Sequence, residues 1–95
     1  MAEDGKFRVE KFNDQNYQLW KMQMEDYLYQ KDLFLPLGGI EKKLMAMKDE
    51  EWEVLDRKEL GIIRLNLEES VAFNISKDKT TKGLMDALAK LYENP

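Results

Sequence analysis

The sequence predicts an all-α fold: a compact bundle of about five helices, counting short ones, with an extended N-terminal arm. Gly occurs 5 times and Pro 2 times in 95 residues, which disfavours a turn-rich β fold. Hydrophobic residues make up 43% of the chain, enough for one small core. In several segments they recur at three- and four-residue steps, as one face of a helix requires. We expect residues 1–6 to be disordered and residues 7–95 to form a single helical domain.

The arm and the first helix are predicted from local patterns. In residues 7–11, Phe7 and Val9 alternate with charged side chains, which indicates an extended stretch lying on the helices. Asn13 is a good N-cap, and Phe12 before it and Tyr17 four residues after it have the spacing of a hydrophobic staple. We therefore expect the first helix to run from near Asn13 to around Lys31. Its apolar stripe, interpreted as core rather than as a base-stacking platform, comprises Tyr17, Trp20, Met24, Tyr27 and Leu28.

The middle of the chain should contain a connector and a second long helix. Residues 33–35 are expected to tuck into the core, whereas residues 40–48 are ambiguous and could form one loose helical turn. Asp49 is a plausible N-cap, and the acidic residues after it suit the positive end of a helix dipole. Apolar residues cover a wide arc from there to Leu67, so this helix should be central and contact neighbours on two sides.

Two shorter helices are expected to complete the bundle. A break at Glu68-Glu69 precedes a short helix that contains Val71 and Phe73. After a polar loop, Thr80 or Thr81 should cap the last helix. The predicted core consists of Trp20, Met24, Leu28, Trp52, Ile63, Leu67, Leu84, Leu88 and Leu91.

Composition excludes several classes of function. The chain has no Cys and no His, so it offers no thiol nucleophile, no triad base and no Cys- or His-ligated metal. The net charge of −4 argues against nucleic-acid binding as the main activity, because phosphate-binding domains are usually basic. The polar N-terminus is no signal peptide, and no apolar run approaches the ~20 residues of a membrane span. We predict a soluble, cytoplasmic, non-enzymatic protein without cofactor or membrane contact.

The acidic residues are interpreted as structural. The runs at residues 49–53 and 68–69 suit helix starts, and neither has the alternating oxygen ligands and turn Gly of a calcium loop. Asp56 and Glu59 point near the centre of the apolar arc of the second helix. A buried unpaired carboxylate is costly, so we expect both to pair with a Lys, an Arg or a backbone N–H, although the sequence does not identify the partner.

Lys77, Lys79 and Lys82 form a weak basic cluster, with Asp78 inside it. The simpler interpretation is a solvated loop. The alternative is a weak RNA contact, in which a phosphate would also use the helix N-terminus near Thr81.

A second apolar line lies outside the predicted core stripes. At 100° per residue, Met22 and Tyr29 fall about 120–140° from Tyr17 on the first helix, and Leu19 is also off the stripe. Val54 and Leu65 are off the stripe of the second helix. Neighbouring helices could cover these residues, but so short a chain cannot bury every helix on two sides. We therefore predict an assembly interface that comprises Leu19, Met22, Tyr29, Val54 and Leu65.

Three sequence blocks together carry a resemblance to a known family. The first block comprises Lys11-Phe12-Asn13, Asn16-Tyr17, Trp20-Lys21-Met22, Met24 and Leu28; the second Trp52, Asp56, Ile63, Leu65 and Leu67; the third Thr80-Thr81-Lys82-Gly83-Leu84-Met85, Leu88 and Leu91-Tyr92-Glu93. In their order and spacing these blocks resemble the start of Gag polyproteins of copia-type LTR retrotransposons, especially plant elements, over about residues 7–93. Met85 stands where many relatives have Trp, a hydrophobic exchange that leaves the core interpretation intact.

The resemblance implies the N-terminal helical half of a Gag capsid region, whose copies form a shell around the element's RNA. The second helical half and the Cys/His zinc knuckle of the family are missing, which indicates a fragment or a domesticated remnant. RNA would then be held mainly by the missing downstream regions, and the partner of this chain would be itself, in weak homo-oligomers. The competing hypotheses are a host-domesticated protein-binding module and direct RNA binding.

Overall fold

The computed structural model describes residues 9–75 and 77–93. These residues contain no β-strand, so the all-α class is confirmed, but they form four α-helices rather than about five. Residues 40–48 contribute only a short 3-10 segment. The predicted disordered stretch 1–6 and the start of the predicted arm lie outside the described residues. The elements are α2 (Tyr17–Gln30), η1 (Leu35–Gly38), η2 (Ile40–Lys42), α3 (Asp49–Leu65), α4 (Glu69–Asn74) and α5 (Thr81–Tyr92), where η denotes a 3-10 helix.

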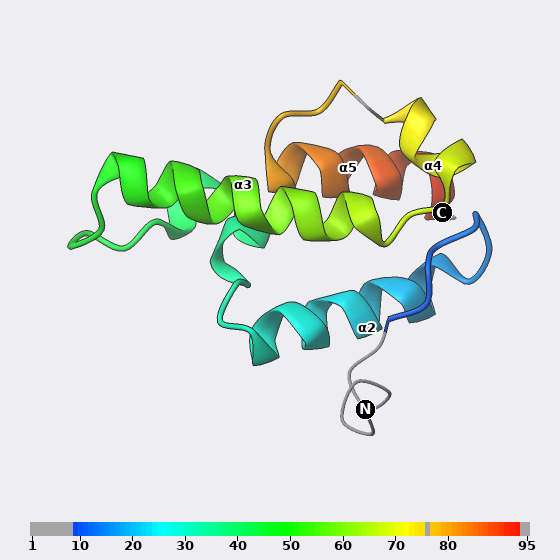
Figure 1. Ribbon diagram of the computed structural model, residues 1–95, viewed down its shortest axis with the longest axis horizontal. Coiled ribbons are helices and arrows are strands. Elements are labelled where there is room, and N and C mark those ends of the chain that lie inside the picture. Colours follow the sequence, from blue (N-terminus) through cyan, green and yellow to red (C-terminus); the bar gives the residue numbers. More distant parts are fainter. Residues whose placement is uncertain (1–8, 76, 94–95) are drawn as a thin grey trace.

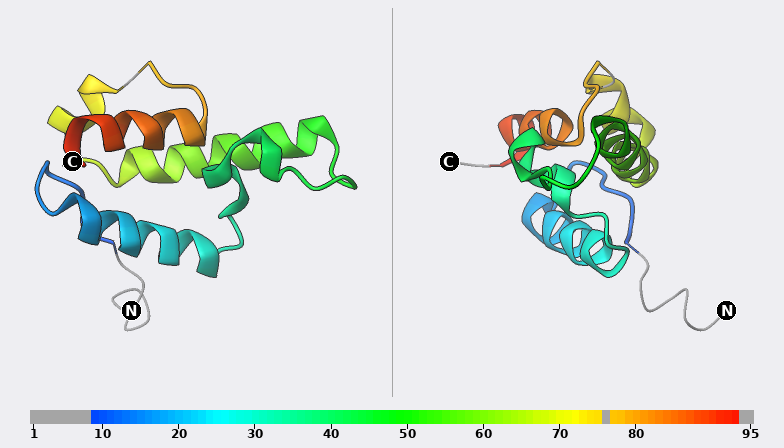
Figure 2. Two further views of the ribbon diagram at one scale, coloured as in Figure 1. Left: turned by 180° about the vertical axis from the view of Figure 1, so that it is seen from behind. Right: turned by 90° about the vertical axis from the view of Figure 1, so that its left-hand side faces the viewer.

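The three long helices form one bundle. α3 and α5 lie side by side and run in the same direction, whereas α2 runs in the opposite direction (Figures 1 and 2). The short helix α4 lies between the end of α3 and the loop that returns to α5, and η1 contacts both α3 and α5. The radius of gyration is 13.5 Å, close to the ~13 Å of a compact 100-residue domain.

α2 begins at Tyr17, later than the predicted start near Asn13. Asp14 and Asn16 adopt left-handed backbone conformations, with φ of 75° and 57°, which a right-handed helix cannot include. The Asn13 side chain instead accepts a 3.3 Å hydrogen bond from the backbone N–H of Gln15, which closes a turn ahead of the helix. The turn formed by these short polar residues therefore delays the start of α2 to Tyr17.

Phe12 fastens the N-terminal segment to the rest of the molecule. Its N–H donates to the carbonyl of Asn66 and its carbonyl accepts from Glu68 N–H, both at 2.9 Å, so it bridges to the link between α3 and α4. Its ring is buried, and its centroid lies 5.3 Å from that of Trp20 and 5.0 Å from that of Tyr92. Phe12 is therefore a core residue that joins three parts of the chain, and not only a staple for α2.

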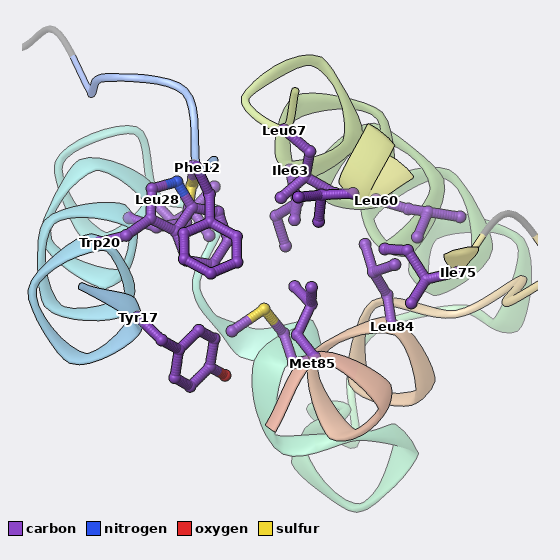
Figure 3. Packing of buried hydrophobic residues seen from close by; sticks show 13 residues of the cluster. Phe12, Tyr17, Trp20, Leu28, Leu60, Ile63, Leu67, Ile75, Leu84 and Met85 are labelled. Carbon is purple, nitrogen blue, oxygen red and sulfur yellow. The ribbon is translucent and has the colours of Figure 1, made fainter. Parts of the chain in front are cut away.

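The core lies where α2, α3, α4 and α5 meet (Figure 3). Every predicted core residue is buried except Leu91, which is 56% exposed. The buried face of α5 is centred on Thr81, Leu84 and Leu88, so Leu91 falls at its edge, and Tyr92 packs against the core instead. Tyr17, which belongs to the predicted apolar stripe of the first helix, is buried as well. The other buried residues of the cluster are Phe12, Leu60, Val71, Ile75 and Met85.

The helix starts follow the expected capping chemistry with small shifts. Asp49 is the first residue of α3 rather than its cap, and the N–H of Lys48 donates to the Glu51 carboxylate at 2.9 Å. Thr80 caps α5, because its hydroxyl accepts a 3.0 Å hydrogen bond from Gly83 N–H.

Candidate assembly interface

The outer side of α2 carries a row of exposed apolar side chains. Leu19, Met22 and Tyr29 expose 50%, 52% and 62% of their surface, respectively. Together with Asp26 they repeat at three- and four-residue steps, so all four residues lie on one face of the helix. The structure therefore places the three predicted interface residues of α2 away from the buried stripe, as their angular spacing indicated.

Phe34 extends this row beyond the end of α2. Its ring centroid lies 4.9 Å from that of Tyr29, and the Phe34 side chain is exposed. The expectation that the whole connector 33–35 tucks into the core is wrong for Phe34, while Leu33 does pack partly against the core. The left-handed conformation of Asp32, with φ of 59°, redirects the chain just before this segment. Sequence periodicity could not find Phe34, because the turn and not a helical repeat positions it.

The outer side of α3 carries the second predicted apolar set. Val54 is 55% exposed and Leu65 is 76% exposed, and Gly61 and Ile62 lie between them. These four residues line a shallow surface groove along α3. Its charged rim consists of Glu50, Glu53, Arg57 and Lys58.

Exposed apolar rows of this kind suit contacts between proteins. Removing apolar surface from water is favourable by about 25 cal/mol per Å². Tyr and Met are enriched in the centres of interfaces, whereas charged residues form the rims. The α2 row therefore has the composition of a contact surface, whereas the α3 face has the charged rim but aliphatic residues at its centre. Other large apolar side chains are also exposed, including Phe73 on α4 and Met45 before α3, and periodicity alone gave no reason to single them out.

The N-terminus of α5 is already occupied by a carboxylate of the protein itself. Asp56 on α3 accepts a 2.9 Å hydrogen bond from Thr81 N–H, and the Thr81 hydroxyl donates to the Asp56 carbonyl at 3.0 Å. Asp56 therefore has one of the partners that were expected for it from the sequence, a backbone N–H. The pair joins α3 to α5 and uses a donor that a phosphate would need.

The lysine cluster is only partly free. The ammonium of Lys82 lies 2.9 Å and 3.2 Å from the two carboxylate oxygens of Asp86, one turn further along α5. Lys77 and Lys79 are exposed in the loop before α5. A weak RNA contact by the three lysines stays a prediction, and it would have to avoid the filled N-terminus of α5.

Glu59 differs from its expected arrangement. Its side chain is fully buried, and neither carboxylate oxygen has a hydrogen-bond partner within the described part of the chain. Burial and, to a smaller extent, the nearby charge of Asp56 together raise the pKa of this carboxyl from 4.5 to about 8. The group is therefore mainly a neutral acid at neutral pH. The expected pairing with Lys, Arg or a backbone N–H does not occur for Glu59.

The described residues carry no group of three or more acidic, His or Cys side chains that could hold a metal ion. None of the helices described is long and apolar enough to cross a membrane.

The chain is similar to a protein of a plant retrotransposon. It is 38% identical over 88 residues to the retrovirus-related Pol polyprotein from transposon TNT 1-94 of Nicotiana tabacum. The match covers 92% of this chain and 7% of that polyprotein, in its N-terminal region. The chain is thus related to a retrotransposon protein and spans a small part of that relative's length. No protein-family model matches the chain, and no solved structure matches it significantly.

Proposed function

We propose that this chain is a structural Gag capsid domain of a copia-type retrotransposon, whose copies assemble into a virus-like shell around the element's RNA. The observation that carries the proposal is the pair of exposed apolar faces on α2 and α3, in a helical domain related to a retrotransposon polyprotein. A closed shell requires each copy to contact more than one neighbour, and two separate faces meet that requirement. One contact can be weak, because repeated contacts in a shell reinforce one another.

The proposed role is non-catalytic and cytoplasmic. The chain has no Cys or His, so it can supply neither a thiol nucleophile nor an imidazole base. Its net charge of −4 makes it a poor ligand for RNA, so other regions of such a polyprotein would hold the RNA. This domain would contribute protein–protein contacts and no membrane contact.

The α2 row is tested by placing a charge in it. Met22→Asp and Tyr29→Asp should leave helical content and melting temperature nearly unchanged, because both side chains are exposed. Each should weaken the concentration-dependent self-association of the chain in sedimentation velocity, because only the α3 face then holds copies together, and should block particle formation in a polyprotein that contains this domain. Gln23→Asp places the same charge on an exposed position of α2 outside the row and serves as the matched control.

Two outcomes would contradict this assignment. If either variant unfolds, the side chain belongs to the folded core. If both variants fold and particles still assemble, the α2 row is not the contact, and the α3 face becomes the next candidate.

A host-domesticated binding module is the alternative function. The same exposed faces on α2 and α3 would then hold a different protein rather than a second copy. Sedimentation against concentration separates the two functions, since the capsid domain self-associates weakly, whereas the domesticated module stays monomeric at every concentration.

A further inference from the structure

The first half of the α3 groove carries opposite charges on the two sides of Val54. Glu50, Val54 and Lys58 follow one another at four-residue steps, so they lie on one face of the helix. With a rise of 1.5 Å per residue, Glu50 lies about 6 Å on one side of Val54 and Lys58 about 6 Å on the other. The face therefore presents an acid, an apolar centre and a base in line.

Neither charge has a partner inside the molecule. Glu50 and Lys58 are both exposed, and the described part of the chain contains no ion pair that involves either of them. Residues eight apart in a helix are too distant to pair with each other. Both groups are therefore available to charges on another molecule.

We propose that the first half of the α3 groove, from Glu50 to Lys58, binds the same segment of a second copy of this chain, with the two helices antiparallel and a two-fold axis at Val54. In that arrangement Val54 faces its own counterpart, and Glu50 of each copy faces Lys58 of the other. A parallel arrangement in register would instead set Glu50 against Glu50 and Lys58 against Lys58. Like charges oppose that orientation, so the charges select the antiparallel pair.

This proposal rests on the proposed function, because it names the partner and geometry of one of the two assembly faces.

Charge reversal in the full chain tests the proposal. Glu50→Lys and Lys58→Glu should each weaken self-association on the order of tenfold in sedimentation equilibrium, because each replaces two attractions with two repulsions. The double variant Glu50→Lys/Lys58→Glu restores both pairs and should return to within about threefold of the wild type. Glu41→Lys and Lys90→Glu are matched control variants, since they make the same charge changes at exposed positions outside the groove. Circular dichroism melts check that every variant is folded.

A cysteine crosslink tests the axis independently. The chain has no Cys, so Val54→Cys introduces a single thiol. A residue on a two-fold axis lies next to its own counterpart, and Val54→Cys should therefore oxidise rapidly to a covalent dimer, while Phe73→Cys on α4 should not.

The outcomes separate this proposal from the proposed function. If the wild type self-associates but the reversals have no effect, or the double variant stays weak, the antiparallel α3 contact is wrong and the capsid function stands. If the wild type is monomeric at every concentration and Val54→Cys gives no dimer, both proposals are wrong.

Discussion

The buried carboxyl of Glu59 makes the stability of this domain depend on pH in an unusual direction. The pKa of the carboxyl is about 8 in the folded protein and 4.5 without burial. Below pH 4.5 both folded and unfolded chains hold the proton, so the group has no effect on stability. Between pH 4.5 and 8 the unfolded chain releases the proton while the folded chain keeps it, so the free energy of unfolding falls as pH rises. Above pH 8 the carboxyl is ionised in both the folded and the unfolded chain, so the free energy of unfolding falls no further on account of this group.

The size of this effect follows from the same two pKa values. At about 1.4 kcal/mol for each pH unit that separates them, the destabilisation above pH 8 is roughly 5 kcal/mol. Total stabilities of domains are ~5–15 kcal/mol, so a loss of this size is a large share of the stability of a typical domain. Most acidic groups in proteins act in the opposite sense, because their partners lower the pKa.

Glu59→Gln removes the ionisation and keeps the shape of the side chain. The variant should match the wild type near pH 4.5 and should exceed its stability by several kcal/mol at pH 8.5, because only the wild type must bury a charge there. Urea unfolding followed by fluorescence of the two buried Trp residues, at half-unit steps from pH 4.5 to 8.5, measures the difference. The other acids contribute equally to both proteins, so the difference in unfolding free energy between the variant and the wild type reports on Glu59 alone.

Glu53→Gln is the matched control for this experiment. Glu53 is an exposed acid on the same helix, so the same substitution there should leave the pH dependence of the wild type unchanged. A difference in unfolding free energy between Glu59→Gln and the wild type that stays constant from pH 4.5 to 8.5 would refute the reasoning. That result would mean that the carboxyl has the same pKa in the folded and unfolded chains.

Three other substitutions and assays probe the core, the α3–α5 link and the lysines. Trp20 is buried against Phe12, so Trp20→Ala should cost about 3–5 kcal/mol and should lower the melting temperature by tens of degrees or unfold the domain; an unchanged melt would show that Trp20 is not in the core. Asp56→Ala leaves Thr81 N–H without its acceptor and should cost about 1–3 kcal/mol in urea unfolding, whereas an unchanged midpoint would mean that water replaces the carboxylate at no cost. The isolated chain should bind RNA no more tightly than about 10⁻⁴ M at physiological salt in a fluorescence assay; submicromolar binding would overturn this, and the first residues to mutate would be Lys77, Lys79 and Lys82.

Local sequence determined the type and order of the long helices. The three- and four-residue spacing of apolar residues placed α2, α3 and α5, because a helix that packs on one core must concentrate its apolar side chains on one face. The same spacing marked Met22, Tyr29 and Val54 as lying outside that face, and they are exposed. Angular position on a helix is a local property, so sequence alone is sufficient to predict it.

Tertiary structure decided the features that depend on which segments meet. Phe12 is buried because the start of α2 and the end of α5 pack around its ring. Leu91 is exposed because it lies at the edge of the buried face of α5, whereas Tyr92 packs against the core. Glu59 is buried without a partner although its neighbour Asp56 has one, a difference that follows from what lies opposite each side chain. Spacing along one helix specifies the direction in which a side chain points but not what it meets there, because the opposing groups come from distant parts of the chain.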